Sequence, residues 1–137
     1  MTIQRQSHLE PHQVRQLTAM YQSEWWTKGR SLTDVEAMLR GSDLLFAYVD
    51  TLGDLAAFAR VLTDGVYKAF LFDVIVRADC RGTGLGARIV HDVAANPTLS
   101  RVASIELYCK PELAPFYEAL GFTSDVDGIL LMRRKLH

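Results

Sequence analysis

The chain has 137 residues, of which 49% are hydrophobic and 23% are charged; these proportions are typical of one globular domain. They exclude a disordered tail, a collagen and a low-complexity linker. Because 15 basic residues stand against 16 acidic ones, the net charge is -1, and there is no broad positive field to attract a nucleic-acid backbone.

Hydrophobic periodicity predicts the elements of the first half of the chain. A short first strand is followed by a helix with Pro11 at its first position, where proline is favoured. A second helix begins at a capping box, Thr33 to Glu36, and stops at Gly41. The strands predicted in this half, the last three forming a meander, cover residues 2–7, 44–49, 55–62 and 66–77.

The second half of the chain alternates helices with strands. Its predicted elements are a helix at 84–96, a strand at 102–109, a short helix at 111–121 and closing strands at 122–125 and 129–135. The order βααβββαβαββ predicts one α/β domain over residues 1–137, with a mixed central sheet of about seven strands and about four flanking helices. Because the helix at 84–96 forms a crossover, the strands before and after it should be parallel.

The sequence shows no pattern typical of a targeting segment, a disulfide scaffold or a metal site. The first residues have no apolar signal-peptide core, and the longest apolar run is far below the roughly 20 residues that span a bilayer. Cys80 and Cys109 are too few for a disulfide scaffold and lack metal-ligand spacing. We expect a cytoplasmic protein with no metal, no membrane partner and no nucleic-acid partner.

Residues 81–86 form a glycine-rich loop between a predicted strand and a predicted helix. Gly82, Gly84 and Gly86 permit positive φ and close approach of a ligand to the backbone, and Arg81 can bind phosphate. With the positive end of a helix dipole, this arrangement suits a pyrophosphate. Three interpretations compete: a turn that serves packing only, a dinucleotide-binding loop whose fingerprint would place the third glycine elsewhere, and a coenzyme A site.

Two motifs resemble those of the GCN5-related N-acetyltransferase (GNAT) superfamily. Arg81, Gly84 and Gly86 match its Arg/Gln-x-x-Gly-x-Gly/Ala signature, and residues 114–122 are similar to its Phe-Tyr-x-x-x-Gly-Phe segment. The predicted element order also agrees over essentially the whole chain. The resemblance implies the acyl-CoA N-acyltransferase (GNAT) fold. It also implies transfer of an acetyl group from acetyl-CoA to a primary amine of a small molecule, by direct attack in a ternary complex.

The resemblance further implies roles for individual residues. The backbone of Val74, Ile75 and Val76 would pair with the pantetheine arm, with an N–H near Val74 available to the thioester oxygen. Tyr117 corresponds to the general acid that protonates the leaving thiolate. The residues expected to hold the pyrophosphate are Arg81, Gly82, Thr83, Gly84, Leu85, Gly86 and Ala87.

The general base departs from the family pattern. Family members often carry Glu or His on the strand before the loop, where this chain has Phe70 and Phe72. Asp73 is the only acid on that strand. It either deprotonates or anchors the acceptor amine, or it bonds nearby backbone. Other candidates for the base are Glu24, His8 and His12.

Trp25 and Trp26 lie in the connection between the first two helices, which lines the acceptor pocket in proteins of this fold. Either one ring contacts the acceptor by stacking or a cation–π interaction, or both pack as a lid or at a dimer interface. An arylalkylamine or a polyamine-like acceptor would suit these side chains. Open alternatives are a non-catalytic acyl-CoA-binding or sensor module, acetylation of a protein or peptide amine, and a nucleotide-binding protein. Edge strands at the C-terminus leave a homodimer open.

Overall fold

The structure is a computed structural model that describes residues 2–137. The chain divides into two compact units, one ending at Glu106 and the other beginning at Leu107. We describe each unit by itself, and the single domain expected over 1–137 stays a prediction.

The first unit contains one five-stranded sheet in which the strand order equals the chain order. Strands β1 to β4 pair antiparallel, and β4 pairs parallel with β5, which confirms the predicted crossover. The strands are β1 (Gln4–Gln6), β2 (Leu44–Val49), β3 (Leu55–Thr63), β4 (Lys68–Val76) and β5 (Ser104–Glu106).

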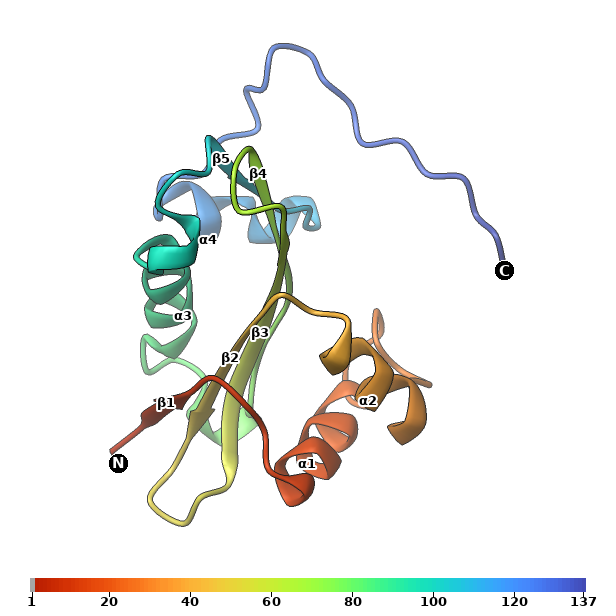
Figure 1. Ribbon diagram of the computed structural model, residues 1–137, viewed down its shortest axis with the longest axis vertical. Helices are drawn as coiled ribbons and strands as arrows, with labels where there is room; N and C mark the ends of the chain where they lie inside the picture. The colour runs from red at the N-terminus through yellow and green to blue at the C-terminus, as the bar shows by residue number, and fades with distance from the viewer. Residues whose placement is uncertain (1) are drawn as a thin grey trace. The chain divides into compact units, whose positions relative to one another are not determined.

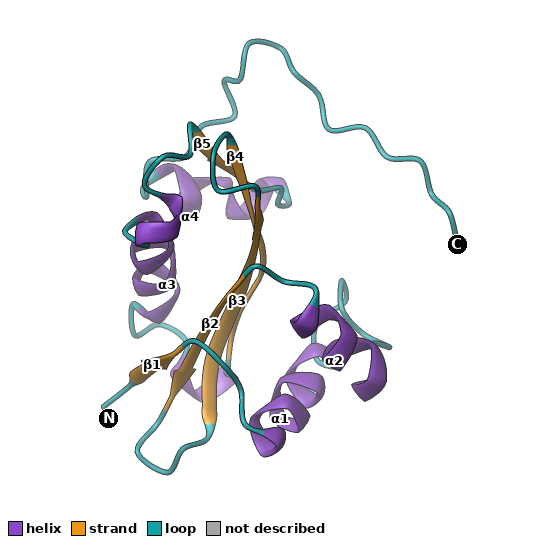
Figure 2. Ribbon diagram, viewed as in Figure 1, coloured by secondary structure: helices purple, strands orange, loops and turns teal. Residues whose placement is uncertain are grey.

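Helices cover both faces of this sheet (Figures 1 and 2). They are α1 (Pro11–Tyr21), α2 (Leu32–Arg40) and α3 (Leu85–Ala94). Successive side chains of a strand point to opposite faces of the sheet, so two neighbouring residues of β2 identify which helices pack on each face. Ala47 belongs to the core formed with Leu17 and Val35 of α1 and α2, whereas Tyr48 bonds Asp92 of α3. The sheet is therefore the middle layer of the first unit.

The helix boundaries follow local capping chemistry. Pro11 opens α1 and Gly41 is the C-cap residue of α2, as predicted. The predicted start of α2 at Thr33 is wrong: the N-cap is Ser31, whose side-chain oxygen accepts a hydrogen bond from the Asp34 N–H at 3.1 Å. A hydroxyl three residues before a free helix N–H satisfies that donor, so the helix begins one residue after Ser31.

The second unit contains a 3-10 turn, Pro111–Leu113, and the short helix α4, Ala114–Glu118. The expected strands at 122–125 and 129–135 are not formed, so the sheet has five strands instead of about seven. A strand needs a partner for its backbone groups. The residues from Ile129 to Met132 are all apolar and do not alternate with polar ones, so the pattern does not specify which side of this segment would pack on a sheet. These side chains are exposed.

Among residues 2–137, no helix is long and apolar enough to cross a membrane.

Candidate active site

A bulge interrupts β4 at Asp73. Ile75 pairs with Phe58 and Phe72 pairs with Arg60, so two residues of β4 face a single residue of β3 between these pairs. Asp73 has a φ of 59°, in the left-handed region that few residues other than glycine adopt. A bulge of this kind redirects side chains and removes one residue from the ladder.

The bulge places Asp73 on the same face of the sheet as its neighbour Phe72. The Arg60 guanidinium donates from Nε to Asp73 Oδ2 at 2.8 Å and also lies over the Phe72 ring, 4.9 Å from its centroid. In a regular strand, two successive side chains would point to opposite faces. The same face carries α1 and α2, because Tyr21 at the end of α1 also reaches Asp73.

Three side chains from different parts of the chain bind one oxygen of Asp73. Arg30 Nη1 donates to Oδ2 at 2.7 Å, and the Tyr21 hydroxyl donates to it at 3.1 Å, together with Arg60. The Asp73 side chain is only 6% exposed. Burial opposes ionisation of the carboxyl group, but the hydrogen bonds from Arg30 and Arg60 outweigh it and hold the pKa of Asp73 below its ordinary value.

The same cluster changes the acidity of Tyr21. Burial, followed by the charge of Asp73, raises the pKa of the Tyr21 phenol far above its ordinary value, and Arg30 lies over its ring at 4.7 Å from the centroid. Tyr21 is therefore a hydrogen-bond donor at all physiological pH values. We name Tyr21, Arg30, Arg60 and Asp73 the Asp73 cluster.

Pairing between β4 and β5 ends early. Only Lys68, Ala69 and Phe70 of β4 have partners on β5, so beyond Phe70 the β4 edge away from β3 has no strand partner within residues 2–137. The backbone of Val74, Ile75 and Val76 lies in this stretch. An edge with unpaired backbone groups can take an extended ligand as an additional strand.

The glycine loop follows β4 and leads into α3. Gly82 and Gly84 have φ values of 73° and 84°, which glycine adopts without steric cost, and Gly84 is the N-cap of α3. The hydroxyl of Thr83 donates to the Cys80 carbonyl oxygen at 2.6 Å and fixes the turn between them. The first N–H groups of α3 have no acceptor within the helix, so the loop and Leu85, Gly86 and Ala87 together present backbone donors.

Arg81 connects this loop to the segment between α1 and α2. Its Nε donates to the Val76 carbonyl oxygen at 3.1 Å, and its Nη2 donates to Glu24 Oε1 at 2.9 Å. The Arg81 side chain is 54% exposed. The guanidinium is therefore accessible beside the loop, and its contact with Glu24 is a surface ion pair of the weak kind.

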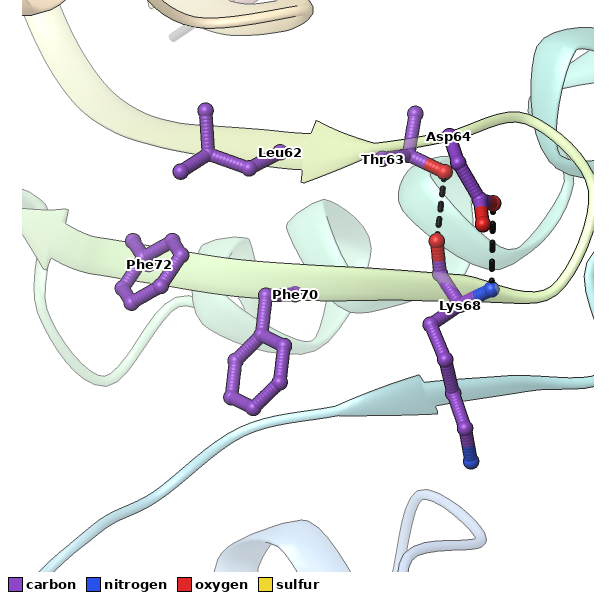
Figure 3. A pocket seen from close by; sticks show the side chains of 6 residues that line it. All are labelled: Leu62, Thr63, Asp64, Lys68, Phe70 and Phe72. Carbon is purple, nitrogen blue, oxygen red and sulfur yellow. Dashed lines mark hydrogen bonds between the residues drawn. The ribbon is translucent and has the colours of Figure 1, made fainter.

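An open depression of about 300 Å³ lies beside the Asp73 cluster. The stacked rings of Phe70 and Phe72, 5.5 Å apart, form its apolar part (Figure 3). Lys68 stands at the other end, where its Nζ binds Glu106 at 2.7 Å. The complete lining is Leu62, Thr63, Asp64, Lys68, Phe70 and Phe72. Since Phe72 also touches Arg60, the depression adjoins the bulge on the helix α1 and α2 face.

Both tryptophans lie in the turns between α1 and α2. Trp25 is 69% exposed and Trp26 is 37% exposed. The segment is held by the buried Thr27 hydroxyl, which donates to the Tyr21 carbonyl oxygen at 2.8 Å. A contact of either ring with an acceptor stays a prediction.

In the second unit, Tyr117 lies on α4 and its spacing to Gly121 and Phe122 has a local explanation. Gly121 has a φ of 97°, and the Phe122 N–H donates to the Tyr117 carbonyl oxygen at 3.1 Å. This is the helix-ending motif in which glycine takes the left-handed conformation and the next residue packs against the last turn. The Tyr117 ring accordingly meets Phe122 edge-to-face at 5.8 Å.

The phenol of Tyr117 is protonated at neutral pH. Burial, followed by the charge of Cys109, raises the pKa of Tyr117 to about 12. Its ring also meets Phe116 edge-to-face at 4.9 Å. Tyr117 can therefore donate a proton, and its role as general acid stays a prediction.

Sequence analysis missed three members of the Asp73 cluster, namely Tyr21, Arg30 and Arg60. One signal was present: Arg60 is a single charged residue within the apolar strand Leu55–Thr63, and buried charges require a partner. Among the described residues 2–137, no group of three His, Cys, Asp or Glu side chains could hold a metal ion.

Residues 40–124 match the family model described as acetyltransferase (GNAT) domain. The uncharacterized N-acetyltransferase ycf52 of Pyropia yezoensis is 30% identical over 117 residues, which cover 83% of this chain and 67% of the algal protein. Serotonin N-acetyltransferase 2, chloroplastic, of Oryza sativa subsp. japonica is 40% identical over 77 residues, which cover 56% of this chain and 38% of the rice protein. The shared segment is thus less than half of the rice enzyme.

One solved structure is similar to this chain over nearly its whole length. It is a protein from Xanthomonas campestris pv. campestris whose description assigns it to the GNAT family. It superposes with a TM-score of 0.84 at 26% sequence identity, over 99% of this chain and 94% of the other.

Proposed function

Because this chain belongs to the GNAT family of N-acetyltransferases, we propose that it acetylates the primary amine of a small aromatic molecule, an arylalkylamine. Enzymes of this family use acetyl-CoA as cosubstrate. The observation that carries the choice of acceptor is the depression with stacked Phe70 and Phe72 beside the β4 bulge.

The coenzyme side fits the glycine loop. A pyrophosphate would accept hydrogen bonds from the backbone of residues 82–87 and would lie at the positive end of the α3 dipole. Arg81 would exchange its surface contact with Glu24 for a charge-assisted bond to phosphate. The pantetheine amides would extend along the edge of Val74, Ile75 and Val76 that has no strand partner among the described residues, as an added strand does.

The reaction needs one bond formed and one broken. The neutral amine attacks the thioester carbonyl carbon, the new C–N bond forms, and the C–S bond breaks as the coenzyme leaves as a thiolate. The N–H of Val74 would bind the carbonyl oxygen while it carries negative charge. The phenol of Tyr117 would give its proton to the thiolate and recover one from solvent.

In this proposal the ammonium group loses one proton to water before the attack, and the nitrogen loses a second proton to water after the C–N bond has formed. A general base works best when its pKa lies near the working pH, whereas the Asp73 carboxylate has a lowered pKa and is bound by two guanidinium groups. In this proposal Asp73 is therefore neither the base nor a direct anchor of the amine.

Three features support an aromatic acceptor. The volume of about 300 Å³ is at the lower end of the range of small-molecule pockets. The Phe70 and Phe72 rings offer faces for offset or edge-to-face packing. The carboxylates nearest to the depression already have hydrogen-bond partners. Asp64 accepts from the backbone N–H groups of residues 66–68, and Asp73 and Glu106 are paired with arginines and with Lys68, so little is left to attract the several ammonium groups of a polyamine. In addition, the rice relative is named as a serotonin N-acetyltransferase, and serotonin is a primary arylalkylamine.

The test is release of coenzyme A from acetyl-CoA, with product mass, across arylalkylamines, polyamines and peptide N-termini. We expect kcat/KM for the best arylalkylamine to exceed that for the best polyamine at least tenfold. Phe70→Ala should remove most of that preference, because one apolar contact distinguishes substrates by about 10- to 200-fold. Tyr67→Ala, which removes an exposed aromatic ring from the turn just before β4, is the matched control. A polyamine or peptide preference, or a Phe70→Ala variant with unchanged preference, would contradict the proposal.

A further inference from the structure

The Asp73 cluster holds an unfavourable backbone conformation. A non-glycine residue with positive φ is uncommon, and aspartate and asparagine are the side chains that tolerate it best. Asp73 adopts a φ of 59° inside a strand, where its neighbours are extended. Such a conformation persists only where the surroundings fix it.

The surroundings that fix it are three donors on one carboxylate oxygen. Tyr21 ends α1, Arg30 lies in the connection to α2, and Arg60 lies on β3, and all three reach Asp73 Oδ2 within 2.7 to 3.1 Å. The side chain is almost fully buried, so no water shell competes with these donors. The carboxylate is thus held by side chains from the end of α1, from the connection to α2 and from the paired strand β3.

The strained residue immediately precedes Val74. A bulge takes one residue out of the ladder and changes the direction of the backbone there. The orientation of the Val74 N–H therefore depends on the conformation of Asp73. Small errors in such orientation are expensive, since a misplacement of about 1 Å can cost roughly 10²-fold in rate.

We propose that Asp73 is a positioning residue: its carboxylate, bound by Tyr21, Arg30 and Arg60, holds the β4 bulge so that the Val74 N–H faces the thioester oxygen. This inference rests on the proposed function, because it assigns the thioester to that N–H. Arg30 gives the cluster a second effect, since it ties the connection between α1 and α2 to the same point of β4.

Three substitutions separate the side-chain bonds from the backbone conformation. Asp73→Asn keeps the shape and the tolerance for positive φ but removes the charge. Asp73→Gly loses the side-chain hydrogen bonds but keeps the tolerance for positive φ. Asp73→Ala loses the hydrogen bonds and that tolerance. We expect kcat to fall about tenfold in Asp73→Asn and about 10²-fold in Asp73→Gly, with Asp73→Ala lowest. The Kd for coenzyme A, measured by calorimetry, should change much less than kcat, because the pyrophosphate contacts lie in the glycine loop and involve no residue of the cluster.

A pH profile distinguishes positioning from proton transfer. If Asp73 only positions the bulge, kcat/KM of Asp73→Asn falls by the same factor at every pH, and the apparent pKa values of the profile are those of the wild type. Loss of one limb of the profile would overturn the inference, because it would make Asp73 the base. A kcat of Asp73→Gly within twofold of the wild type would also overturn it, as would parallel losses of kcat and coenzyme affinity.

Asp92→Asn is the matched control, since Asp92 binds the Tyr48 hydroxyl at 2.8 Å on the other face of the sheet. The kcat of this variant should be unchanged.

If the alanine and glycine variants do not fold, Tyr21→Phe replaces them, because it removes one of the three donors to Asp73. It should lower kcat and leave the coenzyme affinity unchanged, and an unchanged kcat would overturn the inference. A wild-type protein without turnover on any amine would overturn the proposed function. Normal wild-type turnover with an indifferent Asp73→Gly variant would overturn this inference alone.

Discussion

The two faces of the sheet each carry a cluster made of tyrosine, aspartate and arginine. On the face of α1 and α2, Tyr21 donates to Asp73 at 3.1 Å and Arg30 lies over the Tyr21 ring at 4.7 Å. On the face of α3, Tyr48 donates to Asp92 at 2.8 Å, and Arg88 lies over the Tyr48 ring at 5.3 Å. The chemical groups and their contacts are closely similar.

The clusters differ in burial, in charge balance and in backbone. The Asp92 side chain is 30% exposed and meets one arginine at 3.8 Å along its own helix, whereas Asp73 is 6% exposed and meets two. A nearly buried carboxylate needs strong partners to stay charged, and only Asp73 sits in strained backbone. The same three residue types thus attach a helix to the sheet in one place and fix the shape of a strand in the other.

Alanine substitution at the two aspartates should separate the clusters most clearly. Asp73→Ala leaves two partly buried guanidinium groups without their counter-charge, and we expect a loss of about 3 kcal/mol in the free energy of unfolding. Asp92→Ala removes the acceptor of the buried Tyr48 hydroxyl but leaves no buried pair of arginines without a counter-charge, and should cost roughly 1 kcal/mol. Urea denaturation followed by circular dichroism measures both. Equal losses would show that burial and the second arginine contribute nothing.

Acid should weaken the Asp73 cluster in a defined pH window. Burial disfavours the charged carboxylate, but hydrogen bonds from Arg30 and Arg60 lower its pKa overall. A carboxyl group with a lowered folded-state pKa stabilises the fold above its unfolded pKa of about 3.9, and this stabilisation is lost as the pH falls through the folded-state pKa. The stability difference between the wild type and Asp73→Asn should therefore shrink below about pH 5. A difference that is constant from pH 7 to pH 3 would contradict this linkage.

The smallest effect is expected at the ion pair between Arg81 and Glu24, because the Arg81 side chain is 54% exposed and no tyrosine hydroxyl is known to bind Glu24. Glu24→Gln should release Arg81 for phosphate and tighten coenzyme A binding by about two- to fivefold, the range that a surface pair can supply. Glu36→Gln on α2 makes the same change in net charge and should leave the affinity unchanged. Calorimetric titration at low salt gives the comparison. Weaker binding by Glu24→Gln would show that Glu24 positions Arg81 for the coenzyme.

Local patterns predicted most elements of the first unit. The strands at 44–49 and 55–62, the proline start of α1 and the glycine end of α2 were predicted within one residue, because each depends on neighbours in the sequence. The glycine loop was predicted for the same reason. The strand predicted at 102–109 is only Ser104–Glu106, since the length of an edge strand depends on its partner, and the partner was not visible in the sequence.

The Asp73 cluster could not be predicted because its members are far apart in sequence. Asp73 lies 52 residues from Tyr21 and 43 from Arg30, and only the packing of α1 on the sheet brings them together. The sequence identified Asp73 as a candidate site residue, but nothing in the sequence showed that two arginines bind its carboxylate. The closing strands failed for a related reason: a hydrophobic run predicts that a segment can pair, and only the fold supplies the neighbour.

The coincidence of strand order and chain order in the sheet has a consequence for how the protein folds. Hairpins with short turns join β2, β3 and β4, so these strands make local contacts that form early. The pairing of β4 with β5 joins three residue pairs across the whole α3 crossover and should form last, because loop closure must precede it. The glycine loop lies inside that crossover. A ligand that needs the completed loop binds only the folded protein and stabilises it by mass action. If coenzyme A is that ligand, as proposed, it would protect the protein against unfolding.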